Sequence, residues 1–505
     1  MKKDTSSLSI HINPNRKLFE RSPLIYGHFL EHFHRQIYGG IYDPDSPFAD
    51  EDGFRTDVLD ALKNIQTPII RWPGGCFVSS YNWKKGVGKK RTPVFDKAWR
   101  VEDPNTFGTD EFIKLCRKLN CEPYICTNAG TGTEEEMSDW VEYCNLEYEG
   151  EFAKMRIENG YPEPHHVKYW SIGNENYGSY ELGAKDISTW GRFVWESAKL
   201  MKHVDPTTSL TAAALSDIDW DLSLLKSAYR QLEWISIHMY WDPIHTTNAA
   251  AGYEKCMYYT NSIGDNIRRT RGLLTALGLE NKIRIAFDEW NLRGWYHPNI
   301  HSDVPGITKE EYLYPRDDND INSTYTMADA VFSACFLNEC LRNADIVGMA
   351  NFAPVVNTRG AVYTHKDGIV KRSTYYVFEL YTKYMGDIIL DSYNEGAEKY
   401  YINSEGVQGE VDCIDTVATL DTANNTLAIS LINKHMCDDK IVTLQLGAHD
   451  NVRVITLSGN SADDYNDIDK ETVIPYENGN AVLSDTVDGL TLTLPPHSVN
   501  IVIIY

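Results

Sequence analysis

The chain has 505 residues and a formal net charge of -24, with 48 Lys and Arg against 72 Asp and Glu. Domains usually hold about 100 to 250 residues, so this length predicts two or three domains unless one large α/β barrel accounts for most of it. Nucleic-acid binding needs clustered Lys and Arg to displace counterions from phosphates. The acidic excess therefore argues against nucleic acid as a partner and disfavours polyanionic substrates.

The N-terminal residues, MKKDTSSLSIHINP, contain no apolar stretch of signal-peptide length. Nowhere do about 18 apolar residues run without a charge. The ten cysteines show no CxxC pairing, and a protein that is not secreted keeps its thiols reduced. We therefore expect a cytoplasmic protein with no membrane partner and with mostly buried free thiols.

Residues from about 20 to 390 alternate short β-rich apolar runs with longer amphipathic segments, which indicates repeated βα units and a parallel sheet. Eight strands are predicted, at residues 22–33, 67–75, 121–130, 167–176, 209–217, 233–241, 282–290 and 344–356. Helices are predicted between them, at residues 56–65, 109–120, 134–145, 187–204, 222–232, 262–278 and 325–343, and a last one, TYYVFELYTKYMG, follows the eighth strand. The economical interpretation is an α/β fold, a (β/α)8 TIM barrel over residues 18–388. A doubly wound open sheet is the alternative.

The last part of the chain has a different character. Residues 391–505 contain no Trp and hold 19 acidic residues against 5 basic ones. Runs such as KIVTLQLG and NVRVITLSG alternate with period two, so we predict a C-terminal antiparallel β-sandwich domain over residues 389–505. The N-terminal run LSIHINP also alternates, and we expect residues 1–17 to add a strand to this domain. Its acidity concerns solubility or subunit contacts more than an active site.

In a (β/α)8 barrel the reacting groups project from the carboxyl ends of the strands. Polar residues at the predicted strand ends are Glu31, His32, Arg71, Asn128, Asn174, Glu175, His238, Tyr240, Asp288 and Glu289. Glu175 and Glu289 end the fourth and seventh strands, which face each other across the barrel. Glycoside hydrolysis needs two such converging carboxyl groups, one to protonate the leaving oxygen and one to act at the anomeric carbon. A separation of about 5 to 5.5 Å predicts retention of configuration, and about 6.5 to 9.5 Å predicts inversion.

Several segments of the predicted barrel resemble those of the family-51 glycoside hydrolases, which are retaining α-L-arabinofuranosidases of clan A. They include GHFLEHFHRQIYGGIYD, RWPGGCFVSSYNWKKGVG, YPEPHHVKYWSIGNENYG and IAFDEWN. The resemblance covers essentially the whole barrel and fits the C-terminal domain more loosely. It implies that Glu175, in GNEN, is the general acid/base and that Glu289, in FDEWN, is the nucleophile.

The same resemblance implies roles for five further residues. Asn174 matches an Asn that hydrogen-bonds the sugar 2-hydroxyl, and Glu31, in EHF, matches a carboxylate that holds other hydroxyls. Arg71, in RWPGG, is expected at the floor of the site. Tyr240, in HMYW, is expected near the nucleophile, and His238 is expected to line the same pocket.

These assignments require different ionisation of the two catalytic carboxyl groups. Glu175 needs a raised pKa to be protonated near neutrality, which apolar and like-charged neighbours can supply. Glu289 needs to stay ionised, and Arg71 and Tyr240 are the residues expected to help.

Two positions depart from the family pattern. Many members carry a Gln in the strand-eight segment, whereas this chain reads FAPVVN with Pro354 there. Proline has neither a side-chain donor nor an N–H, so we name Asn351 or Asn357 as candidate replacements. Cys76 follows RWPGG, where some members carry Asn. Both changes bear on sugar specificity rather than on the chemistry.

All twelve Trp lie between residues 72 and 295. Those at strand ends or in loops are candidates for stacking against sugar rings: Trp83, Trp99, Trp241, Trp290 and Trp295. We expect this role chiefly of Trp99 and Trp295.

Other motifs are discounted. His28, His32 and His34 lie close together, but no zinc-type spacing accompanies them and retaining glycosidases need no metal, so neither metal nor cofactor is expected. The Gly-rich basic run GVGKKR, residues 86–91, follows no strand and precedes no predicted helix, which argues against a phosphate cradle.

The sequence therefore predicts an intracellular exo-acting α-L-arabinofuranosidase. It would release terminal non-reducing arabinofuranosyl units from arabino-oligosaccharides or arabinoxylo-oligosaccharides by double displacement. The alternatives are another specificity with the same mechanism, namely a β-xylosidase, an endo-β-glucanase or a galactofuranosidase, and an inactive sugar-binding barrel. Because family members are commonly oligomeric, the resemblance implies a homo-oligomer, with a hexamer as one candidate.

Overall fold

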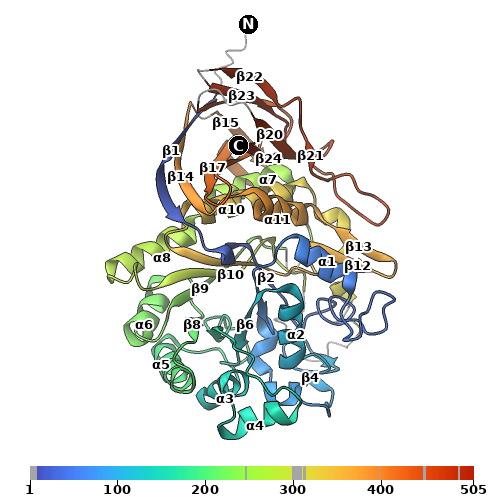
Figure 1. The fold of residues 1–505 in the computed structure, drawn as a ribbon, viewed down its shortest axis with the longest axis vertical. Helices are drawn as coiled ribbons and strands as arrows, with labels where there is room; N and C mark the ends of the chain where they lie inside the picture. The colour runs from blue at the N-terminus through green and yellow to red at the C-terminus, as the bar shows by residue number, and fades with distance from the viewer. Residues whose placement is uncertain are drawn as a thin grey trace.

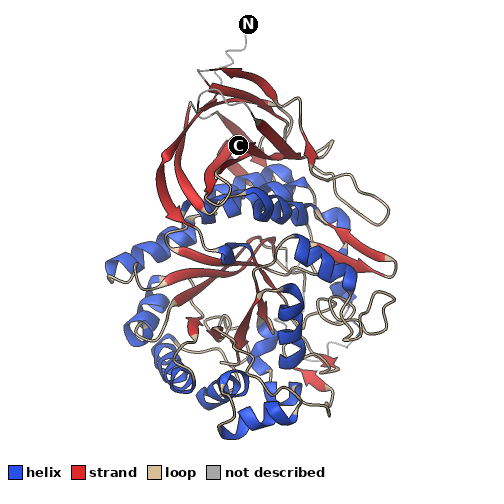
Figure 2. Cartoon of the chain, in the orientation of Figure 1, coloured by secondary structure: helices blue, strands red, loops and turns tan. Residues whose placement is uncertain are grey.

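The computed structural model describes residues 8–505 except 245–246, 298–309, 311–313, 397, 447–450 and 487–488. The molecule has two parts along its long axis: a barrel surrounded by helices, and above it a ten-stranded sheet that we call the upper sheet (Figure 1). Figure 2 shows helices around the strands of the barrel, with the upper part made almost wholly of strands.

Eight strands form one sheet in the order β8-β7-β6-β3-β2-β11-β10-β9, and all neighbours in it are parallel. Their bounds are β2 (Gly27–Phe29), β3 (Ile69–Trp72), β6 (Glu122–Thr127), β7 (Tyr169–Ile172), β8 (Ser209–Ala212), β9 (Trp234–Asp242), β10 (Arg284–Arg293) and β11 (Val347–Phe352). A parallel bridge between Ala213, next to β8, and Ser236 of β9 joins the two ends. The predicted (β/α)8 barrel is confirmed, and the open sheet is wrong.

The helices cover the outside of this barrel. They are α1 (Thr56–Asn64), α2 (Thr109–Leu119), α3 (Glu134–Asn145), α4 (Gly150–Glu158), α5 (Ile187–Val204), α6 (Ile218–Ala228), α7 (Tyr253–Tyr259), α8 (Asp265–Ala276), α10 (Met327–Arg342) and α11 (Ser373–Tyr384). The sequence pattern predicted all of these except the short α4 and α7.

The first predicted strand is much shorter than expected. Residues Pro23–Tyr26 form a 3-10 helix instead, because Pro23 suits a helix start and the Ser22 hydroxyl accepts a hydrogen bond from the Leu24 N–H at 3.2 Å. Only Gly27–Phe29 remain for β2.

Ten strands form the upper sheet in the order β21-β20-β24-β18-β17-β14-β1-β19-β23-β22. They are β1 (Leu8–Glu20), β14 (Ile388–Glu395), β17 (Ile414–Asp421), β18 (Thr426–Asn433), β19 (Lys440–Gln445), β20 (Val452–Leu457), β21 (Tyr476–Glu477), β22 (Val482–Thr486), β23 (Gly489–Leu494) and β24 (Ser498–Ile504). Alternate residues such as Ile10, Val442 and Leu492 pack into one apolar core. The C-terminal sheet domain is thus confirmed.

The N-terminal strand breaks the expected antiparallel pattern. It pairs antiparallel with β14 but parallel with β19. Residues 1–7 of the predicted strand lie outside the described residues. We propose the division predicted from the sequence, residues 18–388 and 389–505 with 1–17, because β14 begins at Ile388 and pairs with β1.

Helices α10 and α11 lie between the barrel and the upper sheet (Figure 1). Arg342, the last residue of α10, donates to Asp415 of β17 at 2.9 Å, and the Tyr381 hydroxyl of α11 lies 2.9 Å from the Ser430 hydroxyl of β18. Three two-stranded hairpins complete the structure: β4 (Val94–Asp96) with β5 (Val101–Asp103), β12 (Val362–His365) with β13 (Gly368–Lys371), and β15 (Lys399–Ser404) with β16 (Val407–Asp412). Within the described part of the chain, we find no helix with the length and apolar character that crossing a membrane requires.

Candidate active site

A cavity of about 350 Å³ opens at the carboxyl ends of the barrel strands. Its lining residues are Glu31, Gly75, Cys76, Trp99, Asn174, Glu175, Tyr180, Tyr240, Glu289, Gly294, Trp295 and His297. The sequence analysis assigned ten residues to the catalytic site, namely Glu31, Arg71, Cys76, Trp99, Asn174, Glu175, His238, Tyr240, Glu289 and Trp295. Eight of these ten line the cavity. The other two, Arg71 and His238, lie directly behind the wall and contact its carboxylates. The structure therefore brings all ten together.

Glu175 lies three residues beyond β7, with a left-handed backbone φ of 44°. Its Oε1 accepts a hydrogen bond from His238 Nδ1 at 2.8 Å, and its Oε2 accepts one from the Tyr180 hydroxyl at 2.8 Å. Burial raises the pKa of Glu175, but the charge and hydrogen bond of His238, with that of Tyr180, outweigh it and leave the pKa below its ordinary value. This reverses the expected direction, because a cation rather than an apolar wall faces the carboxylate.

Glu289 lies within β10 and is held by two donors. The Tyr240 hydroxyl donates to its Oε1 at 2.6 Å, and Arg71 donates to its Oε2 at 2.9 Å. Burial, with the charge of Glu175, raises the pKa of Glu289 above its ordinary value, although His238 and Arg71 oppose that shift. Both predicted partners of Glu289 are therefore in place.

The two carboxyl groups lie close to each other. One oxygen of Glu175, one of Glu289 and one nitrogen of His238 lie within 4.8 Å of one another. That spacing fits the separation of about 5 to 5.5 Å in retaining glycosidases and is too short for the inverting range. A His with two carboxylates is also a possible cation-binding set, but here Nδ1 of His238 is already engaged by Glu175 at 2.8 Å.

Asp288 lies beneath the site and anchors His238. Its Oδ1 is 3.3 Å from Nε2 of His238, while the Tyr124 and Ser236 hydroxyls donate to its two oxygens at 2.7 and 2.6 Å. Although burial opposes the charged form, Glu289, Asp288 and Glu175 raise the pKa of His238 to about 10. The imidazolium thus lies between two carboxylates, one on each ring nitrogen.

Another buried carboxyl group, that of Glu181, orients Asn174. Arg71 donates to Asn174 Oδ1 at 2.8 Å, and Asn174 Nδ2 donates to Glu181 Oε1 at 3.1 Å. The thiol of Cys76 also interacts with this carboxyl group, and burial raises the pKa of Glu181 to about 7. Sequence reasoning missed Glu181, Tyr180 and His297. They follow strands four and seven in loops, where no period or spacing marks them.

Glu31 lines the cavity with a fully buried carboxyl group. Its Oε1 accepts from the Phe77 N–H at 3.0 Å and from Trp99 Nε1 at 3.1 Å. Its Oε2 is buried and has no hydrogen-bond partner among the described residues. Burial raises the pKa of Glu31 well above its ordinary value.

Trp99 and Trp295 form an aromatic wall of the cavity. Their ring centroids lie 5.6 Å apart, and both rings pack on Phe33, at 4.2 and 4.8 Å. The other Trp candidates are wrong as cavity walls, because they pack within the core. Trp83 stacks on Trp140, Trp241 packs against Phe332, and Trp290 stacks on Phe336.

The candidate replacements for the strand-eight Gln do not reach the cavity. Asn351 donates to the His28 carbonyl at 2.9 Å, and Asn357 donates to the Arg35 carbonyl at 2.7 Å. Neither residue, nor Pro354, lines the catalytic cavity in the described structure. Both side-chain amides donate to backbone carbonyls. The substrate contact that the Gln makes in other family members therefore has no replacement from these two residues.

Known proteins share this architecture over nearly the whole chain. Residues 61–257 match the alpha-L-arabinofuranosidase 1 domain, and residues 288–498 match the alpha-L-arabinofuranosidase C-terminal domain. Alpha-L-arabinofuranosidase C of Emericella nidulans is 34% identical and covers 90% of both chains. The intracellular exo-alpha-(1->5)-L-arabinofuranosidase 1 of Bacillus subtilis is 32% identical and covers 97% of both.

Solved structures agree with these sequence matches. The arabinose complex of the Thermotoga maritima alpha-L-arabinofuranosidase superposes with a TM-score of 0.85 at 32% identity, over 99% of this chain and 100% of that one. A family 51 alpha-L-arabinofuranosidase of Bifidobacterium longum gives 0.86 at 26% identity, over 99% of each chain. With its paired carboxylates, its barrel and these relatives, the chain belongs to the family-51 glycoside hydrolases.

Proposed function

We propose that this protein is a retaining exo-α-L-arabinofuranosidase in which Glu289 is the nucleophile and Glu175 the general acid/base. One observation carries the proposal. The two carboxyl groups lie within 4.8 Å, and each has its own donors. Arg71 and Tyr240 hold Glu289, while His238 and Tyr180 hold Glu175. One group is thereby prepared to attack and the other to exchange a proton.

In the first step Glu289 attacks the anomeric carbon while the bond to the leaving oxygen breaks, and Glu175 protonates that oxygen. His238 explains how a carboxylate with a lowered pKa can act as an acid. Its Nδ1 proton lies on a 2.8 Å hydrogen bond to Glu175, so the pair already holds the proton that the leaving group takes.

In the second step water attacks the glycosyl-enzyme ester, and Glu175 receives the proton of that water. Glu289 then leaves as a carboxylate, to which Arg71 and Tyr240 again donate. The pair of Glu175 and His238 recovers its proton, which closes the cycle.

The rest of the cavity supports a single terminal sugar. Its volume of about 350 Å³ is at the small end of ligand sites, which favours exo action. We propose that Oε2 of Glu31 and the amide of Asn174 bind hydroxyls, that Cys76 contacts the sugar, and that Trp99 and Trp295 stack on its apolar face.

The substrate class follows the relatives. The Bacillus subtilis relative is named as an intracellular enzyme acting on α-(1->5) linkages. We propose that this protein likewise acts inside the cell, in the cytoplasm, on arabino-oligosaccharides or arabinoxylo-oligosaccharides. We also propose a homo-oligomer, with a hexamer as the candidate that light scattering would test.

The test is a panel of aryl glycosides with the product anomer followed by NMR. We expect rapid cleavage of the α-L-arabinofuranoside with the α-anomer of arabinose as first product. Rapid cleavage of only a β-xylopyranoside, a β-glucoside or a galactofuranoside would replace the proposed specificity. A first product of inverted configuration would contradict the mechanism.

A further inference from the structure

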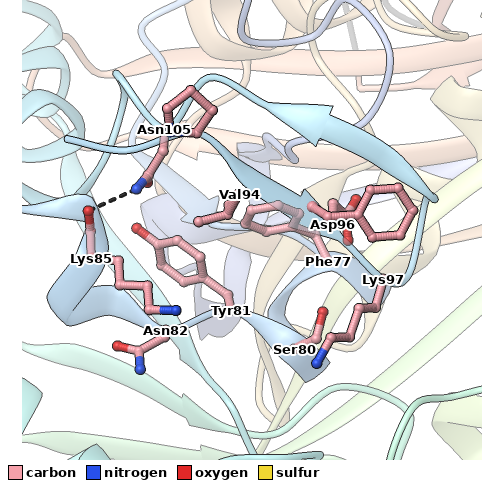
Figure 3. A pocket seen from close by; sticks show the side chains of 11 residues that line it. Phe77, Ser80, Tyr81, Asn82, Lys85, Val94, Asp96, Lys97 and Asn105 are labelled. Atoms are coloured by element: carbon pink, nitrogen blue, oxygen red, sulfur yellow. Dashed lines mark hydrogen bonds between the residues drawn. The ribbon is translucent and has the colours of Figure 1, made fainter.

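A second cavity, of about 300 Å³, lies beside the catalytic one and shares no lining residue with it. It is lined by Phe77, Ser80, Tyr81, Asn82, Lys85, Pro93, Val94, Phe95, Asp96, Lys97 and Asn105. All of these belong to the long connection between β3 and α2 (Figure 3). No step of the proposed reaction uses them.

Two segments contribute to both cavities. Cys76 lines the catalytic cavity while its neighbour Phe77 lines the second one. Likewise Asp96 and Lys97 line the second cavity, and Trp99 lines the catalytic one. Asp96 connects them directly, since its carboxylate accepts from the Trp99 N–H at 3.2 Å. A ligand in the second cavity would therefore lie close to the catalytic cavity.

The lining has the mixed chemistry that suits a neutral polyhydroxylated ring. Phe77, Tyr81 and Phe95 present aromatic surface, and Phe95 is 65% exposed. Lys85 and Lys97 supply donors, and Asp96 supplies an acceptor. An apolar ligand would leave these polar groups without partners.

The two lysines of the lining are available to a ligand. Lys84 and Arg91 pair with Asp139 and Glu111. By contrast, neither Lys85 nor Lys97 forms an ion pair within the described residues, so their ammonium groups remain available to a ligand.

We propose that this cavity is a second carbohydrate-binding site that holds one neutral pentose or hexose ring. The ring is either a more distant unit of the oligosaccharide in the catalytic cavity or a separate sugar molecule. The proposal rests on the proposed function, because that function supplies arabinose-containing oligosaccharides as the ligand.

The test compares a Phe95→Ala/Lys97→Ala variant with the wild type. Both side chains are exposed, so the fold should survive, and the melting temperature checks this. Tyr148→Ala is the matched control, because this aromatic ring is 63% exposed and lies between α3 and α4. Each change is measured on an aryl α-L-arabinofuranoside and on arabino-oligosaccharides of two to five units. Each is also combined with Glu289→Gln, and binding of the same oligosaccharides is measured by calorimetry.

We expect the double variant to keep the wild-type kcat/KM on the aryl substrate and to lose about fivefold to tenfold in oligosaccharide affinity, about 1 to 1.4 kcal/mol. If the double variant loses affinity only for oligosaccharides above a certain length, and one oligosaccharide binds per protein molecule, the ring in the second cavity belongs to the bound substrate. If the wild type binds two sugar molecules and the double variant binds one, the ring belongs to a separate sugar. Unchanged oligosaccharide affinity and KM would overturn the second site. Failure of the wild type to cleave the aryl arabinofuranoside would instead overturn the proposed function.

Discussion

The barrel and the upper sheet differ in how deeply their acidic residues are buried. In the barrel, Glu31, Asp288 and Glu289 are at most 6% exposed and converge at one end of the strands. Residues 391–505 contain 19 of the 72 acidic residues, yet none of those that the structure describes there is buried. Acidic composition therefore does not locate the function, whereas the convergence of buried carboxylates at one cavity does.

The physical difference lies in the cost of desolvation. A buried carboxylate is destabilising unless cations and hydrogen bonds compensate it. Here Arg71 and His238 supply that compensation. The carboxylates of the upper sheet keep contact with solvent even where they form ion pairs, as Asp415 does with Arg342 and Glu477 does with Arg453.

Among the changes considered, removal of Arg71 should have the largest effect, because Arg71 compensates the buried carboxylates of the barrel. We expect Arg71→Met to lower kcat/KM by about 1,000-fold, because Glu289 and Asn174 each lose a donor. It should also lower the free energy of unfolding by about 3 to 5 kcal/mol, since buried carboxylates are left without their cation. Steady-state kinetics and urea denaturation measure the two effects. Arg453→Met, at the exposed pair with Glu477, is the control and should change stability by less than about 0.5 kcal/mol. Equal effects of the two changes would refute the contrast.

His238 should control the alkaline side of the pH profile. The wild-type pair of Glu175 and His238 keeps its proton until the pH rises towards the His238 pKa of about 10. In His238→Gln, Glu175 alone must hold that proton, so kcat/KM should fall at a lower pH and by about 100-fold for poor leaving groups. The measurement is kcat/KM against pH for aryl arabinofuranosides of graded leaving-group pKa. An unmoved alkaline limb would show that His238 does not share the proton.

Tyr240 should control the acidic side. Its hydrogen bond lowers the pKa of Glu289, so Tyr240→Phe raises that pKa further. Because the nucleophile must be ionised, the activity that is lost as pH falls should then be lost at a higher pH. We expect about a tenfold fall in kcat/KM, the value of roughly one hydrogen bond to a charged group. A shift of the acidic limb towards lower pH would contradict the assigned contact.

Neutralising acids of the upper sheet should have the smallest effect. Asp463→Asn, Glu471→Gln and Asp439→Asn together change three exposed carboxylates. We expect kcat/KM within about twofold of wild type and a change in unfolding free energy of less than about 0.5 kcal/mol per site. A large loss of activity would show that the acidity of this domain serves the active site after all.

The barrel and the strand-end residues of the site could be predicted from regular patterns in the sequence, whereas Cys76, Trp99 and Trp295 were named from the family resemblance or as loop aromatics. Strand periodicity places Arg71, Glu175 and Glu289 at strand ends, and the barrel geometry then brings those ends together. Strand β10 shows the limit of this reasoning. It also places Asp288 beside the nucleophile, but the hydrogen bonds of Asp288 to Tyr124 and Ser236 come from other strands and leave no pattern in the chain.

Loops and electrostatics were not predictable in the same way. Glu181 reaches Asn174 from an irregular loop, and the lowered pKa of Glu175 depends on a 2.8 Å contact with His238 from another strand. Gly86, in the run GVGKKR that was discounted as a phosphate cradle, is needed for steric reasons. A Cβ at this position would lie about 2.2 Å from the hydroxyl of Tyr81, a lining residue of the second cavity.

The central claim is that Glu289 attacks the sugar and that Glu175 exchanges the proton. Azide rescue of Glu289→Ala and Glu175→Ala on an activated aryl α-L-arabinofuranoside tests it most directly. Without Glu289, azide must attack the substrate itself and give the inverted β-azide. Without Glu175, azide must attack the glycosyl-enzyme and give the retained α-azide. The account predicts these two opposite anomers, and the same anomer from both variants, or the reverse pair, would contradict it.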